Sequence, residues 1–437
     1  MLIDVTTYKD LSIFQGEDEY SVFSKLNFTN TVEGREQLLK FFKTPLKDIK
    51  EITQVQNIVR KMSRLMADWP TQISNGTLMV LVKFYESNLD SIPRGSVVSS
   101  YNYRLFNSAD YAILRFSVEH FIRFVKGMYQ LIAMAKQSDL PHPAAHYIAL
   151  AESILRKPAF VEVFKVNEDQ KLSITDNTYF GKFFKEEARA DIFQLIAIFG
   201  KFDAWYSMAK AQEHYQLVLP EFIESDKPEL EVEGLFHILL DNPVSYNVNL
   251  NQKSNFIFLT GANMAGKSTF IRAVGISVYL AHLGMGIPAA SAKMSVFNGL
   301  LSNINVLDNI FKGESYFFNE VQRIKNTITK VMSGNKWLVL IDELFKGTNV
   351  EDAVRCSTTV IKGLVKIDQS LFILSTHLYE IANELKEYDN ISFRYFETNI
   401  NGEQLEFSYK LKEGVSKDRL GYLILNREGV VDLLNNI

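Results

Sequence analysis

Two long stretches in the middle of the chain carry apolar side chains at intervals of three and four residues. The first covers 114–135, about six helical turns, and Asp110 is placed to cap its N-terminus. The second covers 188–206, and a shorter helical pattern covers 51–66. A coiled-coil arm would need the pattern over more heptads. The spacing therefore predicts long helices that pack in an all-helical domain.

From about residue 237 the pattern changes to short apolar runs that alternate with helical stretches. Runs at 255–259, 337–341 and 371–374 read as strands, and a helical stretch lies between each pair. Strands that alternate with helices indicate a parallel sheet with crossover connections. Two later segments, 391–395 and 405–409, alternate apolar and polar positions around an Asn-Gly turn. They predict a β-hairpin.

The composition indicates a globular protein but does not indicate its function. The 437 residues are 47% apolar and 22% charged, which is typical of globular chains with two to four domains. The formal net charge is -4 and no block of like charges stands out. No basic tail is therefore available for strong non-specific binding to nucleic acid, although a local basic patch is compatible with these numbers.

The single cysteine, Cys356, cannot form an internal disulfide, so a reducing compartment is the simplest interpretation. The first ten residues lack the features of a secretory signal. The longest apolar stretch, at 275–290, is too short for a bilayer span. The sequence predicts a cytoplasmic protein without membrane association.

The segment Gly261–Ser268 fits the pattern G-x-x-x-x-G-K-[ST]. It follows a predicted strand and opens a predicted helix, as a phosphate-binding P-loop requires. In such a loop the glycines let backbone N–H groups face phosphate oxygens, Lys267 reaches the β- and γ-phosphates, and the hydroxyl of Ser268 binds Mg²⁺. The predicted nucleotide-binding residues of this loop are Gly261, Ala262, Asn263, Met264, Ala265, Gly266, Lys267, Ser268 and Thr269.

The apolar run 338–341 ends in two carboxylates, Asp342 and Glu343. Parallel sheets bind ligands at this edge, so Asp342 is predicted to hold Mg²⁺ and Glu343 to orient and polarise the attacking water. His377, at the end of the next strand, is a candidate contact of the γ-phosphate or the water, or else an ordinary surface histidine. With Lys267 these residues form the predicted catalytic set. The guanine-selective Asn-Lys-x-Asp is absent, so ATP is favoured over GTP.

Four segments resemble the motifs of the MutS family of DNA mismatch-repair ATPases, which belong to the ABC-type group. They occur in the family's order along the chain. The resemblance covers nearly the whole chain and is strongest from Gly234 onward. The four segments are Thr260–Thr269 (P-loop), Gly313–Glu320 (signature), Asp342–Asn349 (Asp-Glu with its Gly-Thr turn) and Ser375–His377 (similar to Ala-Thr-His).

The resemblance implies an α/β P-loop NTPase of the ABC type at the C-terminal end, preceded by an all-α core and lever domain. The implied division is a helical core domain over 1–100, lever helices over 101–235 and the ATPase domain over 236–437. It also implies a homodimer that encloses two ATP molecules with Mg²⁺.

Two residues of the implied composite site come from outside the P-loop. Ser315 of one subunit would reach the γ-phosphate held by the other, and Asn349 would lie at the interface. Ser315 could equally cap a helix, and both roles can hold. The adenine would pack on Tyr409 and on residues 244–247; the alternative is that Tyr409 is a half-buried strand residue.

Several positions depart from the family pattern. Arg323 and Lys346 stand where an acidic residue and an arginine are expected, and Ala262 replaces a proline. Counterparts of the mismatch-reading domain and its connector are missing, so mismatch reading is not expected.

Three hypotheses about function remain. The first is a MutS-like ATPase whose ATP-driven switch acts on DNA, with repair-pathway proteins as further partners. The second is an ATP-gated dimeric protein-interaction module without DNA binding, which the charge balance and the missing domains favour. The third, a small-molecule kinase, fits less well because the Asp-Glu pair and the histidine suit attack by water.

Overall fold

The computed structural model describes most of the chain. The described residues are 1–14, 20–89, 91–94, 96–167, 171–304, 316–401, 404–416, 425–426 and 429–435.

The chain folds into two compact units that alternate along the sequence. Unit 1 comprises 1–25, 44–53 and 215–437, and unit 2 comprises 26–43 and 54–214. Helices α2 (Val22–Leu26) and α4 (Ile49–Leu65) contain residues of both.

Unit 2 is built from helices throughout its described residues. The apolar stripe predicted over 114–135 is buried in α7, and the stripe over 188–206 is largely buried in α11. The helix predicted over 51–66 is α4, followed by a 3-10 turn, η1. The elements are α3 (Val32–Lys43), η1 (Met66–Asp68), α5 (Asn75–Glu86), α6 (Val97–Phe106), α7 (Ser108–Lys136), α8 (Ala144–Leu155), α9 (Pro158–Lys165), α10 (Ile174–Lys182), the π-helix η2 (Phe183–Glu187) and α11 (Arg189–His214).

The prediction that Asp110 caps the helix over 114–135 is wrong. Helix α7 begins two residues earlier, at Ser108, with Asn107 at the N-cap. Asn107 is also the C-cap of α6, and its N–H donates to the carbonyl of Tyr103. The two helices therefore share one cap residue, and Asp110 lies in the first turn, where its charge still favours the helix dipole.

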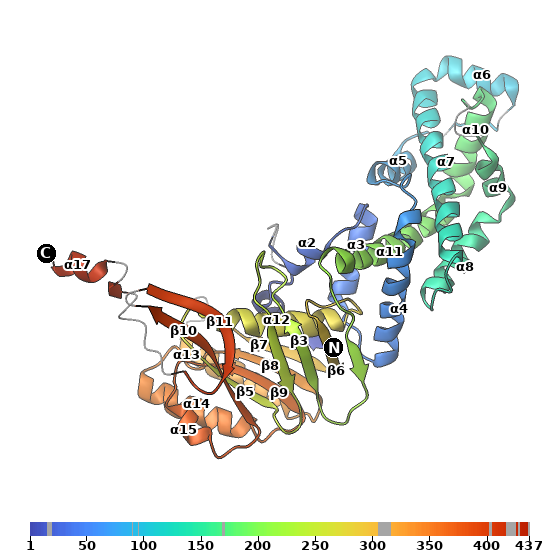
Figure 1. The fold of residues 1–437 in the computed structure, drawn as a ribbon. Coiled ribbons are helices and arrows are strands. Elements are labelled where there is room, and N and C mark those ends of the chain that lie inside the picture. Colours follow the sequence, from blue (N-terminus) through green and yellow to red (C-terminus); the bar gives the residue numbers. More distant parts are fainter. Residues whose placement is uncertain are drawn as a thin grey trace. The chain divides into compact units, whose positions relative to one another are not determined.

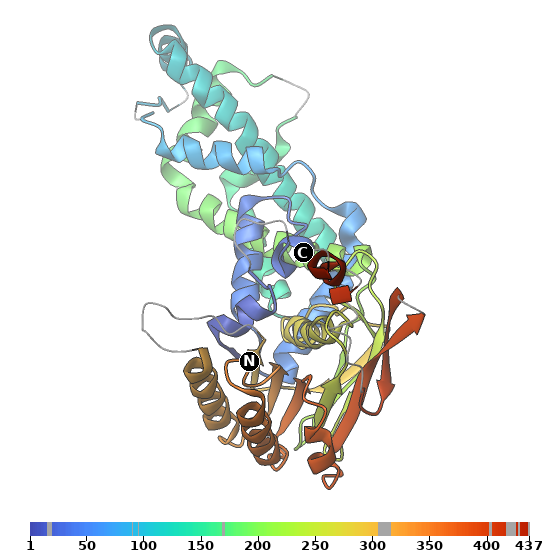
Figure 2. The same ribbon diagram turned by 90° about the vertical axis from the view of Figure 1, so that its left-hand side faces the viewer.

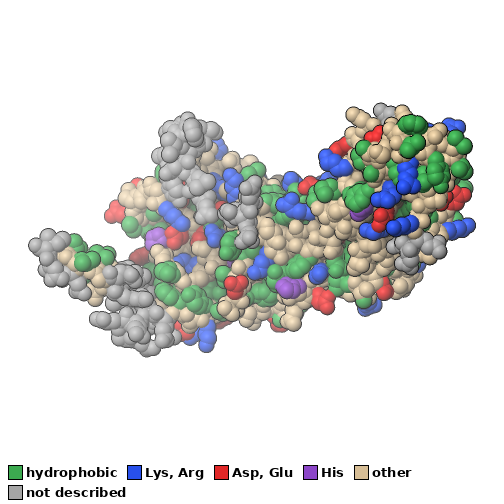
Figure 3. All heavy atoms as spheres, turned by 90° about the horizontal axis from the view of Figure 1, so that it is seen from above, with side chains coloured by type: hydrophobic (Ala, Val, Ile, Leu, Met, Phe, Trp, Pro, Cys, Tyr) green, Lys and Arg blue, Asp and Glu red, His purple; other side chains and the backbone are tan. Residues whose placement is uncertain are grey.

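Several apolar side chains on α6 and the first turns of α7 are exposed on the surface of unit 2. Figure 3 shows hydrophobic side chains beside lysines and arginines on this unit. The exposed residues are Val97, Val98, Tyr101, Leu105, Phe106, Ile113 and Phe116.

Unit 1 contains a large sheet and a smaller one. Among the described residues the large sheet has the strand order β1-β7-β8-β9-β5-β10-β11, parallel except for the β10–β11 hairpin. This confirms the predicted parallel strands and hairpin. Its strands are β1 (Leu2–Ile3), β5 (Phe256–Thr260), β7 (Gly299–Asn303), β8 (Trp337–Asp342), β9 (Ser370–Ser375), β10 (Ile391–Asn401) and β11 (Gln404–Glu413).

Helices cover both faces of the large sheet, which explains why its central strands β5, β8 and β9 are buried at every position and mostly apolar. Helix α12 lies on one face and α14 and α15 lie on the other (Figures 1 and 2). Val339 and Ile341 of β8 face the core shared with α13, α14 and α15. The helices of unit 1 are α1 (Val5–Asp10), α12 (Lys267–Ala281), α13 (Tyr316–Val331), α14 (Val350–Leu364), α15 (Ile381–Leu385) and α17 (Val430–Asn435).

The smaller sheet has the order β2-β6-β3-β4 within the described part of unit 1. Its strands β3 and β4 lead the chain into β5, which precedes the candidate P-loop. The strands are β2 (Glu221–Ile223), β3 (Leu230–Leu235), β4 (Tyr246–Leu250) and β6 (Ser291–Ser295). In the described residues no helix is both long and apolar enough to cross a membrane.

Candidate nucleotide-binding site

A tight loop joins β5 to α12 at the carboxyl edge of the large sheet. Gly261 has φ 140° and Gly266 has φ 106°, values that side-chain-bearing residues rarely adopt. A Cβ on Gly266 would also lie 3.4 Å from the Tyr409 ring. Gly266 is the N-cap of α12, so the loop presents the N-terminus of this helix. Backbone N–H groups in that position favour bound anions.

Lys267, the first residue of α12, is buried beneath this loop. Its Nζ donates hydrogen bonds to the carbonyls of Gly261 (2.8 Å) and Ala262 (2.9 Å). Burial lowers the pKa of Lys267, while Glu343 and Asp342 oppose that effect. The ammonium is therefore a poorly solvated cation aimed into the loop, which suits a strongly charged anionic ligand.

Asp342 ends β8, one strand away from β5 across β9. Its carboxylate accepts hydrogen bonds from the hydroxyls of Ser268 and Ser375. Asp342 and Ser375 are paired in register across β8 and β9. Ser375 was not among the predicted site residues, although it stands two positions before His377 in the same motif. Two hydroxyls thus hold the Asp342 side chain in one orientation beside the P-loop.

Glu343 follows at the start of the next turn in a left-handed backbone conformation, with φ 64°. Its N–H donates to the carbonyl of Ser375 at 3.0 Å. Its carboxylate lies 3.3 Å from the Lys346 ammonium and 3.6 Å from the His377 ring. The His377 contact, with help from Lys346, lowers the pKa of Glu343 to about 2 although burial opposes this. Glu343 is therefore an anion at neutral pH.

Glu320 on α13 is a further residue at this site that the sequence analysis did not assign. It is buried, and its two carboxylate oxygens accept hydrogen bonds from the N–H groups of Lys346 and Gly347, each at 3.2 Å. Burial raises the pKa of Glu320, and the two N–H donors oppose that rise. Glu320 is the last residue of the signature-like segment Gly313–Glu320, and this position in the motif could have identified it as a site residue.

Tyr409 is placed over the P-loop by an irregularity in the hairpin. Opposite the single residue Glu397 of β10, β11 has three residues, 408–410. Tyr409 has φ 51°, in the left-handed region. Such bulges commonly redirect a side chain. The ring is half exposed, so both interpretations of Tyr409 from the sequence remain compatible with its position.

A cavity of about 680 Å³ lies against these groups. It brings together most of the residues predicted from the sequence, from four separate segments of unit 1. Gly261, Ala262 and Ala265 belong to the same loop without lining the cavity. The lining residues are Leu240, Asn242, Val244, Tyr246, Asn263, Met264, Gly266, Lys267, Ser268, Thr269, Asp342, Glu343, Lys346 and Tyr409.

Two predicted residues outside the P-loop, His377 and Asn349, are not among the lining residues, although the His377 ring lies 3.6 Å from the carboxylate of Glu343. Asn349 is the N-cap of α14, where its side chain accepts a hydrogen bond from the N–H of Asp352 at 3.0 Å. Ser315 lies outside the described residues. The predicted roles of Asn349 and Ser315 at a dimer interface stay predictions.

Replacing Tyr409 by alanine tests whether its ring packs on the adenine. Loss of one stacking contact should weaken ATP binding by about 1–3 kcal/mol and leave the binding of Mg²⁺-tripolyphosphate, which has no base, unchanged. Isothermal titration with both ligands measures this. Lys410→Ala, on an exposed neighbouring residue, is the control. An equal loss for both ligands would instead assign Tyr409 to packing of the loop.

Comparisons with known proteins agree with this geometry. Residues 257–431 match the family model of MutS domain V, which is the ATPase domain of an α/β fold. The whole chain aligns with the DNA mismatch repair protein MutS of Thermotoga maritima, at 23% identity over 521 residues, which covers 65% of that relative.

Two further relatives of the same name match over about half of the chain. These are the proteins of Staphylococcus haemolyticus (26% identity over 245 residues, 55% of this chain and 27% of the relative) and Petrotoga mobilis (26% over 231 residues, 52% and 28%). The chain spans less than two thirds of the length of these relatives. The domain V match over 257–431 and these relatives together support a MutS-family protein.

Proposed function

We propose that the chain binds ATP with Mg²⁺ and hydrolyses it. The observation that carries the proposal is the convergence of Lys267, Ser268, Asp342 and Glu343 on one cavity at the edge of the sheet. The MutS family consists of ATPases, which supports the same reaction. Release of inorganic phosphate from ATP by the purified full chain tests it, and no measurable ATP affinity would refute it.

The residues of the cavity fit a magnesium–triphosphate ligand. The hydroxyl of Ser268 and the carboxylate of Asp342 are adjacent oxygen ligands, the kind that Mg²⁺ prefers. No group of three or more His, Cys, Asp or Glu side chains forms a metal site in the described part of the chain. A hard cation held by few protein ligands relies on phosphate oxygens for the rest. When bound, Mg²⁺ neutralises charge on the phosphates.

In the proposed reaction Glu343 orients and polarises the attacking water, and Lys267 stabilises charge on the phosphates. His377 and Lys346 lie within 4 Å of the Glu343 carboxylate, at 3.6 and 3.3 Å. A carboxylate whose pKa is about 2 is a weak proton acceptor. Its contribution is therefore mainly electrostatic and positional.

The finer assignment is an ABC-type P-loop ATPase that works as a homodimer. Each ATP would lie between the P-loop of one subunit and Ser315 and Asn349 of the other. The long helices α7 and α11 of unit 2 are candidates for the levers of an all-α core and lever domain. The division at residues 100 and 235 remains part of this proposal.

The relatives are DNA mismatch repair proteins by name, so we propose that the ATP-driven switch acts on DNA. Titration of duplex, branched and mismatched DNA at low and moderate salt, with ATP present, tests this part. Binding that weakens as salt rises is expected. Absence of affinity for every form would favour the second hypothesis, a dimeric protein-interaction module, whose basis is the formal charge of -4.

A further inference from the structure

A buried guanidinium on α13 departs from the family pattern. Arg323 stands where an acidic residue is expected. Its side chain is only 20% exposed. Burial lowers the pKa of Arg323, and Asp10 and Asp4 oppose that effect. Because a buried charge is strongly destabilising without a partner, this departure requires a compensating group elsewhere in the chain.

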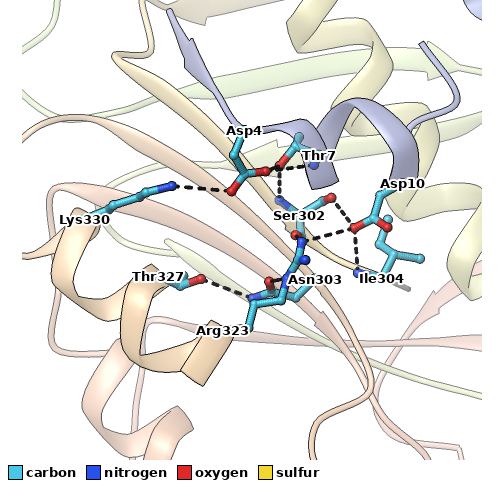
Figure 4. Close-up of polar contacts among 9 residues, drawn as sticks. All are labelled: Asp4, Thr7, Asp10, Ser302, Asn303, Ile304, Arg323, Thr327 and Lys330. Carbon is cyan, nitrogen blue, oxygen red and sulfur yellow. Dashed lines mark hydrogen bonds and ion pairs between the residues drawn. The ribbon is translucent and has the colours of Figure 1, made fainter. Parts of the chain in front are cut away.

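The compensating group is Asp10, at the end of α1. Its carboxylate is buried and lies 3.5 Å from Nη2 of Arg323 (Figure 4). The same oxygen accepts hydrogen bonds from the hydroxyl of Ser302 and from the N–H of Ile304, the latter at 3.0 Å. Asp10 therefore joins the start of the chain to the carboxyl end of β7 and to α13.

Arg323 makes two more bonds across the end of β7. Its Nε donates to the side-chain oxygen of Asn303, and its Nη2 donates to the backbone carbonyl of Ser302. Asn303 in turn donates to the hydroxyl of Thr327 on α13 at 3.3 Å. The guanidinium is thus fixed on several sides, and Figure 4 shows these groups converging on it. This arrangement fixes the position of α13 relative to β7.

Helix α13 carries a second contact three residues before Arg323. Glu320 accepts the N–H groups of Lys346 and Gly347, and the side chain of Lys346 lies 3.3 Å from the carboxylate of Glu343. A continuous series of contacts therefore leads from Asp10 through α13 to the residue proposed to polarise the attacking water.

We propose that Asp10, acting through Arg323 and Glu320, is a positioning residue for Glu343. The proposal rests on the proposed function, because Glu343 has a catalytic role only if the chain hydrolyses ATP. Asp10 does not line the nucleotide cavity. Its influence should therefore appear in the rate of hydrolysis and not in the affinity for ATP.

The same two elements supply a matched control. Asp4, in front of α1, pairs with Lys330 on α13 at 3.4 Å. Both side chains are partly exposed, so this pair contributes little. Lys330→Ala thus removes a contact between the N-terminal segment and α13 without touching the buried network at Arg323.

The first test compares steady-state hydrolysis and ATP affinity of Asp10→Asn, Lys330→Ala and the unmodified protein. We expect kcat of Asp10→Asn to fall roughly tenfold or more, since small misplacement of a catalytic group has effects of this size. Its Kd for ATP should stay within about twofold of the unmodified value, because the P-loop lies outside the network. Unchanged kcat in a folded Asp10→Asn protein would overturn the proposal.

A second test needs no nucleotide and separates this inference from the proposed function. Hydrogen–deuterium exchange reports the protection of the Lys346 and Gly347 amides. These amides should exchange roughly tenfold faster in Asp10→Asn and at the native rate in Lys330→Ala. Native exchange in both variants would overturn the proposal even if ATP is hydrolysed. Faster exchange in a protein without ATPase activity would refute only the proposed function.

A double-mutant cycle distinguishes positioning from general loss of stability. If Asp10 acts through Arg323, then Arg323→Gln already breaks the contacts across β7, and adding Asp10→Asn should lower kcat little further than Arg323→Gln alone. Additive losses would show that the two residues act independently. If Asp10→Asn does not fold, Arg323→Lys provides the same exchange and kcat comparison, because it keeps the charge and loses the two bonds across β7.

Discussion

The Lys267→Ala protein is expected to show no ATP binding in titrations at micromolar ATP. Nζ of Lys267 is held in the loop by two backbone carbonyls and is poorly hydrated. Loss of one partner of a desolvated charge pair costs about 2–5 kcal/mol, which is about 30-fold to several-thousand-fold in affinity.

The fold should survive this change, since alanine is an excellent helix former at the first position of α12. Thermal unfolding without nucleotide should therefore differ little from that of the unmodified protein. Lys253→Ala, on an exposed lysine in the turn before β5, is the matched control and should bind ATP normally. Near-native ATP affinity of Lys267→Ala would show that the phosphates do not bind in this loop.

The Glu343→Gln protein is expected to bind ATP and to hydrolyse it about 10²–10³-fold more slowly, the usual cost of removing one preorganised electrostatic contact at the reacting centre. Glutamine keeps the shape of the side chain and removes the charge that polarises water. ATP that is bound and not hydrolysed should make the closed dimer accumulate, which size-exclusion chromatography with light scattering detects. Single-turnover phosphate release measures the chemical step directly.

Glu351→Gln is the control for this prediction, because Glu351 is exposed in the first turn of α14. Turnover of Glu343→Gln at the native rate would remove Glu343 from the mechanism. The pKa of Glu343 is lowered to about 2 in the folded protein. The carboxylate therefore stays charged from neutral pH down to about pH 3, and a loss of activity between pH 8 and 5 would come from another group.

The P-loop could be predicted from the sequence because its motif is local. The spacing of Gly261, Gly266 and Lys267 encodes a backbone geometry in eight consecutive residues, and the apolar strand before it fixes its position on the sheet. Asp342 was found for the same reason, since it ends an apolar run. Tyr409 was found by resemblance, and its placement depends on a bulge that alternation alone does not reveal.

Contacts between segments that lie far apart in the sequence could not be predicted. The two-residue strand β1 is too short to show a period, and nothing in Asp10 or Arg323 signals that they meet. Glu320 and Ser375 were overlooked because their partners lie on other elements. The prediction at Asp110 was wrong because Asn107 caps both α6 and α7. No loop residues between the two helices mark where α7 begins. Buried polar networks therefore needed the three-dimensional structure.

The pairing of β1 with β7 has a consequence for biogenesis. Leu2 and Ile3 are synthesised roughly 300 residues before their partners, Gly299 and Leu300. At the usual ~5–20 residues per second, a nascent chain takes on the order of 15–60 s to span that interval. During this time unit 2 can be translated completely, while the edge of the unfinished sheet has no neighbour. Strand β1 thus becomes native only long after its synthesis, and Asp10 reaches Arg323 only after both have left the exit tunnel.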